Sequence, residues 1–115
     1  MTIPIYHWEI TGPDAGVLQR FYGELFDWTI NADNPWQYGM VENDDANAVS
    51  GGIGPAMEGG SRVSIYLKVD DLQAYLDRAV ALGGEVVMPP MEVAGVHIAL
   101  FKDPAGNVTG LMLPA

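Results

Sequence analysis

The first half of the chain begins with an apolar segment that is followed by a helical pattern. Residues Ile3–Ile10 are apolar and β-prone, which predicts a strand. Thr11 is a candidate N-cap for the next element, with Pro13 at an early helical position and Asp14 as an acid in the first turn. Apolar residues then recur at spacings of one, three and four, on one face of a helix: Val17, Leu18, Phe21, Tyr22 and Leu25. A helix is therefore predicted after the first strand.

Three short apolar segments follow this helix. They are separated by a polar break at residues 31–35 and by the acidic turn Glu42–Asp45. Short apolar runs between turn signals are typical of strands. We therefore predict three further strands, over Trp28–Ile30, Trp36–Val41 and Ala48–Ile53.

The second half repeats the strand and the helix. Residues Arg62–Val69 alternate between apolar and polar side chains, which predicts a strand with one buried face. Asp70 or Asp71 is the expected N-cap of a second helix, and Gly83-Gly84 is its expected end, because glycine adopts the left-handed conformation that terminates helices. The apolar face of this helix consists of Leu72, Tyr75, Leu76, Ala79 and Val80.

Three strands are again predicted after the helix. They cover Glu85–Met88, Val96–Phe101 and Val108–Leu113. Pro89-Pro90 is expected to end the first of them, since proline cannot donate to a sheet ladder. The sequence Asp103–Asn107 is a strong turn signal before the last strand.

The two halves align with a nearly constant separation along the chain. Asp14 corresponds to Asp71, and Val49-Ser50-Gly51 corresponds to Val108-Thr109-Gly110. Each half therefore has the order strand, helix and three strands, and such a repeat is a structural signal. We predict a single α+β domain over residues 1–115, built from two tandem βαβββ halves at 1–57 and 61–115.

Composition narrows the functional classes. Hydrophobic residues make up 49% of the chain and charged residues 17%, which is typical of a globular fold. The absence of cysteine excludes disulfides and thiolate zinc sites. A net charge of −10 disfavours binding to nucleic acid or to anionic membranes. It suits a cationic ligand, and it is also explained by solubility alone. The N-terminus has no signal-peptide pattern and no apolar run is long enough to span a membrane, so a cytoplasmic protein is expected.

Four motifs occur in a recognisable order along almost the whole chain. They are Phe21–Trp28 around the end of the first helix, Val69–Leu72, Ala81–Gly84, and Asp103–Asn107 before the last strand. In this order and with the repeat, the chain resembles the vicinal oxygen chelate superfamily, which includes glyoxalase I, bleomycin-resistance proteins and extradiol dioxygenases. The resemblance implies curled mixed sheets around a cleft, with the helices on the convex face, and it implies a homodimer.

Metal-dependent members of that superfamily place a His or Gln on the first strand of each half and a Glu on the last strand. Carried over to this chain, the first-strand positions are His7 and Ser64, and the last-strand positions are Gly51 and Gly110. Only His7 retains a side chain suited to bind a catalytic divalent ion, and one imidazole is not enough. We therefore predict no metal and no other cofactor.

The candidate catalytic residues are His7 and Glu9, which alternation places on one face of the first strand. His7 is also explained as a polar residue left from a lost metal site, and Glu9 as a solvated carboxylate. The candidate ligand-binding residues are Ser64, Tyr66, Lys68, His97, Val108, Met112 and Trp36. Lys68 is alternatively expected to pair with an acid such as Glu9, whereas Trp8 and Trp28 are expected to be core.

These observations leave three functional hypotheses. The first is a glyoxalase- or bleomycin-resistance-like protein that binds a small molecule in the cleft without an intact catalytic metal site. The second is a lyase or isomerase that acts on a small carbonyl compound, with His7 or Glu9 as base. The third is an accessory or regulatory ligand-sensing domain.

Overall fold

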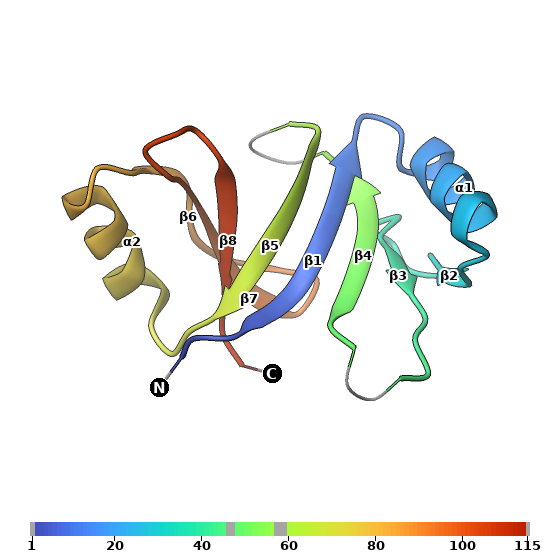
Figure 1. Cartoon of the computed structure of the whole chain (residues 1–115), viewed down its shortest axis with the longest axis horizontal. Helices are drawn as coiled ribbons and strands as arrows, with labels where there is room; N and C mark the ends of the chain where they lie inside the picture. The colour runs from blue at the N-terminus through green and yellow to red at the C-terminus, as the bar shows by residue number, and fades with distance from the viewer. Residues whose placement is uncertain (1, 46–47, 57–59, 115) are drawn as a thin grey trace. The chain divides into compact units, whose positions relative to one another are not determined.

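A computed structural model of the chain describes residues 2–45, 48–56 and 60–114 (Figure 1). Two residues of the predicted repeat boundaries, Met57 and Ala115, lie outside the described part. The described residues form two helices and eight strands in the order β1 (Ile5–Gly12), α1 (Ala15–Phe26), β2 (Ile30–Asn31), β3 (Gly39–Val41), β4 (Ser50–Pro55), β5 (Arg62–Lys68), α2 (Leu72–Ala81), β6 (Glu85–Val93), β7 (Val96–Lys102) and β8 (Val108–Met112). This order confirms the predicted α+β class with two βαβββ repeats.

The chain divides into two compact units. The N-terminal unit consists of His7–Val63, and the C-terminal unit consists of Met1–Tyr6 with Ser64–Ala115. In the N-terminal unit the strand order is β2-β3-β4-β1, with β1 and β4 parallel and the other pairs antiparallel. In the C-terminal unit the order is β5-β8-β7-β6, with only β5 and β8 parallel. Each unit therefore contains a mixed four-stranded sheet.

Helix α1 begins at Ala15 and is capped by Asp14, whose Oδ1 accepts from the Val17 N–H at 3.2 Å. The prediction of Thr11 as N-cap is wrong, and Pro13 precedes the helix. Thr11 is buried in β1 opposite Gly54 of β4, so strand pairing extends farther than the local sequence suggests.

Helix α2 follows its sequence signals closely. Asp71 is its N-cap and accepts from the Ala74 N–H at 3.0 Å. Gly83 has a φ of 104° just after the helix, as the prediction requires. The helix packs against β6 and β7. Its inner face contributes to the core cluster of this unit, Val69, Leu72, Leu76, Ala99 and Leu111.

Strand β6 continues through Pro89-Pro90 to Val93, so the predicted break there is wrong. The pairing of β6 with β7 is irregular between Val86 and Met88 and again between Met88 and Met91. Because β6 is the last strand in the order of its unit, prolines at these irregularities do not remove hydrogen bonds to a second neighbouring strand.

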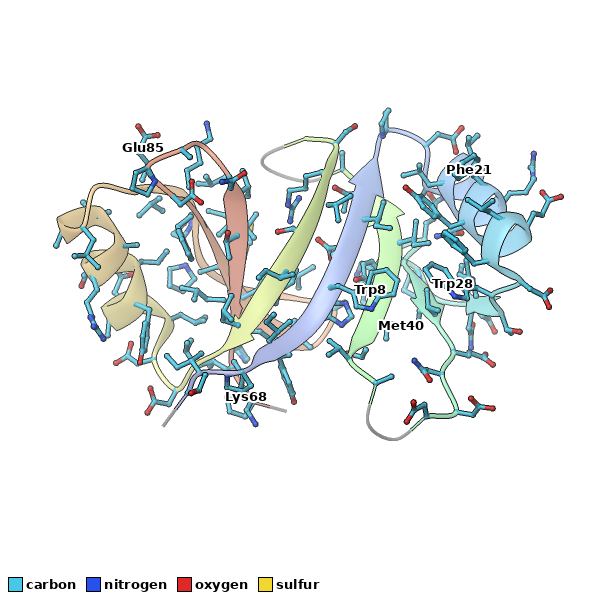
Figure 2. The ribbon with its side chains drawn as sticks, viewed as in Figure 1. Trp8, Phe21, Trp28, Met40, Lys68 and Glu85 are labelled. Atoms are coloured by element: carbon cyan, nitrogen blue, oxygen red, sulfur yellow. The ribbon has the colours of Figure 1, made fainter. Side chains whose placement is uncertain are left out.

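Helix α1 packs against β4 and adjoins an aromatic cluster. Figure 2 shows Trp8 and Trp28 close together, and their ring centres lie 5.5 Å apart. The centre of the Phe26 ring lies 5.1 Å from that of Trp28. Both tryptophans are half-buried, in partial agreement with the predicted core positions. Neither described helix is long and apolar enough to cross a membrane.

Candidate functional site

One face of β1, its polar face, carries three buried polar side chains and is the candidate site of the N-terminal unit. His7, Glu9 and Thr11 alternate along one side of the strand and are all buried. On the other side, a Cβ at Gly12 would lie 2.8 Å from Leu18 of α1. The polar side chains therefore lie on the face of the sheet that α1 does not cover.

Two hydroxyl groups hold the His7 imidazole. Its Nδ1 lies 2.9 Å from the Ser50 Oγ and its Nε2 lies 2.7 Å from the Tyr38 hydroxyl. Ser50 is the register partner of His7 on the parallel strand β4. Burial lowers the pKa of His7 below its ordinary value of 6.5, and the nearby Glu9 charge opposes that shift. A neutral imidazole has one donor and one acceptor, and hydroxyl groups can complement both.

Tyr38 is a site residue that the sequence analysis missed. A Cβ at Gly52 would collide with the Tyr38 ring, and a Cβ at Gly54 would lie 2.5 Å from it, so the ring lies across these two glycines. Asn34 fixes the preceding loop, because its side chain accepts from the Tyr38 N–H at 3.1 Å and donates to the Tyr38 carbonyl at 2.7 Å. Alternate glycines on one strand face are the sequence signal for such an aromatic neighbour.

Glu9 forms a buried ion pair with Arg62, another residue that the sequence analysis did not select. The Arg62 Nη2 lies 3.1 Å from the Glu9 Oε1, and the two side chains are 7% and 8% exposed. The expectation of a solvated Glu9 is therefore wrong. Lys68, the alternative partner for Glu9, lies in the C-terminal unit with its Nζ 5.2 Å from the centre of the Tyr6 ring (Figure 2).

The strand registers correct one of the four metal-ligand positions that were carried over from the superfamily. In the C-terminal unit Gly110 pairs with Tyr66, whose repeat equivalent is Glu9, and Glu9 pairs with Gly52. Gly52 is thus the counterpart of Gly110 on the polar face. Gly51, the predicted position, pairs with Trp8, and a Cβ there would collide with the indole ring.

The positions that correspond to metal ligands in the superfamily supply few side-chain donors in this chain. Gly52 and Gly110 supply no side-chain ligand, and the Ser64 hydroxyl donates to the Val108 carbonyl at 2.8 Å. Both ring nitrogens of His7 contact hydroxyl groups. Within residues 2–45, 48–56 and 60–114, no three His, Cys, Asp or Glu side chains gather as a metal site would require.

The predicted ligand-binding residues of the C-terminal unit have different surroundings. Ser64 and Tyr66 are buried on β5, and the Tyr66 ring lies over Gly110. Val108 and Met112 are half-buried on the neighbouring strand β8. These four side chains therefore belong to one pair of strands.

Two other predicted ligand-binding residues are exposed. His97 is on β7 with its Nε2 3.5 Å from the Glu92 Oε2 of β6. Trp36 precedes β3, in the loop that leads to Tyr38, and is also exposed. Both remain predictions as ligand contacts.

Comparison with known proteins links this geometry to one family. The model of the glyoxalase-like domain family matches residues 9–112. "Putative glyoxylase CFP32" of Mycobacterium tuberculosis is 33% identical over 107 residues, which cover 85% of this chain and 41% of that protein. "Anthracycline biosynthesis protein DnrV" of Streptomyces peucetius is 30% identical over 116 residues, covering 85% and 42%. The chain thus spans about two fifths of the length of these curated relatives.

Solved structures show the same fold at low identity. A glyoxalase/bleomycin resistance protein/dioxygenase superfamily member from Vibrio splendidus is 15% identical, with a TM-score of 0.62 over 98% of this chain and 100% of that chain. Methylmalonyl-CoA epimerase from Mycobacterium tuberculosis is 17% identical, with a TM-score of 0.64 over 96% and 87%.

Proposed function

Because this chain belongs to the glyoxalase-like domain family, we propose that it binds a small organic molecule at the polar face around His7 without a tightly held divalent metal. The observation that carries the proposal is the imidazole of His7, which is held between the hydroxyls of Ser50 and Tyr38. Both hydroxyls can donate or accept, so they suit a ligand that carries carbonyl or hydroxyl oxygens.

The relatives support an aromatic compound as the first ligand to test. Two of them are named as anthracycline biosynthesis proteins, from Streptomyces peucetius and from a second Streptomyces strain. Tyr38 offers a ring face for stacking and a hydroxyl for hydrogen bonding, a combination that suits polar aromatic ligands. We therefore propose a hydroxylated aromatic carbonyl compound as the ligand class.

A lyase or isomerase activity on a carbonyl compound is the second candidate. The observation in its favour is the lowered pKa of His7, because a neutral imidazole near pH 7 can accept a proton from carbon or oxygen. Glu9 suits the role of base less well, since its carboxylate is held by the Arg62 guanidinium.

The test uses protein that has been dialysed against a chelator, with 1,8-dihydroxyanthraquinone as the probe. We expect elemental analysis to find far less than one divalent ion per chain and calorimetry to show saturable probe binding. His7→Gln and Tyr38→Phe should each weaken that binding about tenfold, which corresponds to about 1.4 kcal/mol. Arg20→Gln, on the exposed surface of α1, is the control and should bind as the original chain does.

Three results would contradict the proposal. Stoichiometric metal in the dialysed protein, or probe binding that requires added zinc, would overturn the metal-independent mechanism. If neither His7→Gln nor Tyr38→Phe changed the affinity for the probe, the probe would not bind at the polar face around His7. Conversion of small carbonyl compounds, lost in His7→Gln, would instead favour the lyase or isomerase.

A further inference from the structure

A second site is suggested by a cavity within the C-terminal unit, on the side of its sheet that α2 covers. The cavity has a volume of about 390 Å³ and is bounded by side chains of α2, β5, β7 and β8 and by Ile3. This volume lies within the range of small-molecule sites. None of the residues predicted to bind ligand or to act as a base lines it.

The cavity exists because the side chains on the inner face of α2 become smaller toward the end of the helix. Leu72 and Leu76 fill the core near the start of the helix, and Ala79 follows them one turn later. A methyl group at this position fills much less space than a leucine side chain. Val69 and Leu111 belong to the same core cluster and also line this cavity.

Two cations line this otherwise apolar cavity. The chain has five Lys and Arg residues against fifteen acids, yet Arg78 of α2 and Lys102 of β7 both border the same space. The guanidinium carbon of Arg78 lies 5.4 Å from the centre of the Tyr75 ring, which also lines the cavity.

The acids near these cations leave them available to a ligand. Among the described residues, no carboxylate lies within ion-pair distance of Arg78 or Lys102. Glu85 is the register partner of Lys102 but forms no such pair. Asp103 also lines the cavity, but its carboxylate accepts hydrogen bonds from the Ala105 N–H and from both nitrogens of Asn107. Its oxygens are therefore committed to the turn before β8.

We propose that this cavity binds an amphipathic anion, namely a carboxylate with an apolar chain or ring body. The carboxylate pairs with Arg78 and Lys102, and the apolar body lies against Val69, Tyr75 and Leu111. Apolar lining and positive charge together select for such a compound, since a neutral analogue lacks the ion pair and a cation is repelled. The net charge of the chain makes an anion the least expected ligand elsewhere on its surface.

The experiment compares decanoate with decanol and decyltrimethylammonium, each below its micelle concentration. Binding is followed through backbone amide shifts of the full chain. We expect decanoate to bind about fivefold more tightly than decanol, since partly exposed ion pairs contribute modestly, and the ammonium compound to bind most weakly. The largest shifts should occur at Val69, Ala79 and Leu111.

Variants separate the contribution of charge from that of shape. The double variant Arg78→Gln/Lys102→Gln should bind decanoate only as well as decanol. Arg20→Gln on α1 removes a cation from the N-terminal unit and should leave decanoate affinity unchanged. Ala79→Leu fills the cavity and should abolish binding of both compounds, while its thermal unfolding transition shows that the chain still folds.

Three outcomes would overturn the proposal. One is equal affinity for decanoate and decanol, and another is the same decanoate affinity in the double variant as in the original chain. The third combines two observations: the original chain binds no decanoate, and Ala79→Leu abolishes its self-association. That result would identify a second copy of the chain as the occupant of the cavity.

Discussion

His7 combines burial, a lowered pKa and two hydroxyl partners in one residue. The unfolded chain has an ordinary imidazole with a pKa near 6.5, whereas the folded chain resists protonation. Ser50 and Tyr38 then set how the neutral ring is oriented. In the folded chain His7 is therefore a hydrogen-bonded imidazole that favours the neutral form.

This shift predicts a pH-dependent stability. Well above pH 6.5 both states hold a neutral imidazole, so His7 contributes no pH dependence there. As the pH falls below that value the unfolded chain binds a proton that the folded chain does not, and the free energy of unfolding decreases. Urea unfolding at a series of pH values should show this decrease and a smaller one in His7→Gln. Identical pH profiles for the two proteins would contradict the assignment.

Gly110 supplies space for the buried Tyr66 ring. A Cβ at this position would collide with ring atoms of Tyr66, which is almost fully buried. We expect Gly110→Ala to lower the free energy of unfolding by about 1–3 kcal/mol, as overpacking of a core does. Gly16→Ala is the matched control, because its Cβ would lie 3.5 Å from the nearest atom and alanine favours the helix. Equal effects in the two variants would show that Tyr66 can move aside.

At the scale of elements, strand pairing determines where the polar side chains lie. The parallel pairing of β1 with β4 brings Ser50 to His7 and Gly52 to Glu9. The short β5 segment within the N-terminal unit brings Arg62 to Glu9. Each of these contacts joins residues that are more than forty positions apart in the sequence.

The buried ion pair predicts a large effect at Arg62. Arg62→Met leaves the Glu9 carboxylate without its cation in a buried position, so we expect the free energy of unfolding to fall by about 3–5 kcal/mol. Arg20→Met, at an exposed position, should change it by less than about 0.5 kcal/mol. The double variant Glu9→Gln/Arg62→Met should recover part of the loss. Denaturant unfolding measures all three, and a loss in Arg62→Met no larger than in Arg20→Met would contradict a stabilising pair.

At the scale of the whole molecule, the outer face of α1 is an apolar surface that the N-terminal unit does not bury. Val17, Phe21 and Leu25 are 56%, 58% and 59% exposed and lie at successive turns of the helix. Figure 2 labels Phe21 on α1. Arg20 and Glu24 flank this stripe, so a two-fold antiparallel arrangement can place Arg20 of one copy near Glu24 of the partner subunit. Exposed apolar stripes of this kind are typical of surfaces that contact another protein, and a second copy of the chain is the partner that we test.

We accordingly predict a homodimer that depends on this stripe. Light scattering after size-exclusion chromatography should give twice the 12.4 kDa mass of the chain. Phe21→Glu should shift the protein to monomer, because a charge would be buried without a partner. Val80→Glu, at an exposed apolar position of α2, is the control and should remain dimeric. A monomeric original chain, or equal dissociation by both variants, would contradict the prediction.

The sequence by itself determined the features that depend on neighbouring residues. Asp71 and Gly83 mark the ends of α2, Asp103 organises the turn before β8, and the repeated order of elements gives the α+β class. These signals work from sequence because each acts through hydrogen bonds or backbone conformations within a few residues. The same local logic placed His7 and Glu9 on one strand face.

Only the tertiary structure decided which distant side chains meet that face. Tyr38 and Arg62 carry no local signal for their roles, since their partners lie in other strands of the sheet. The register of β1 with β4 shows that Gly52, and not the predicted Gly51, is the counterpart of Gly110 on the polar face. Neighbouring residues of a strand point to opposite faces, so an error of one position selects the wrong face. The sequence of a strand predicts which side chains share a face. Which residues of other segments those side chains contact depends on how the strands pair.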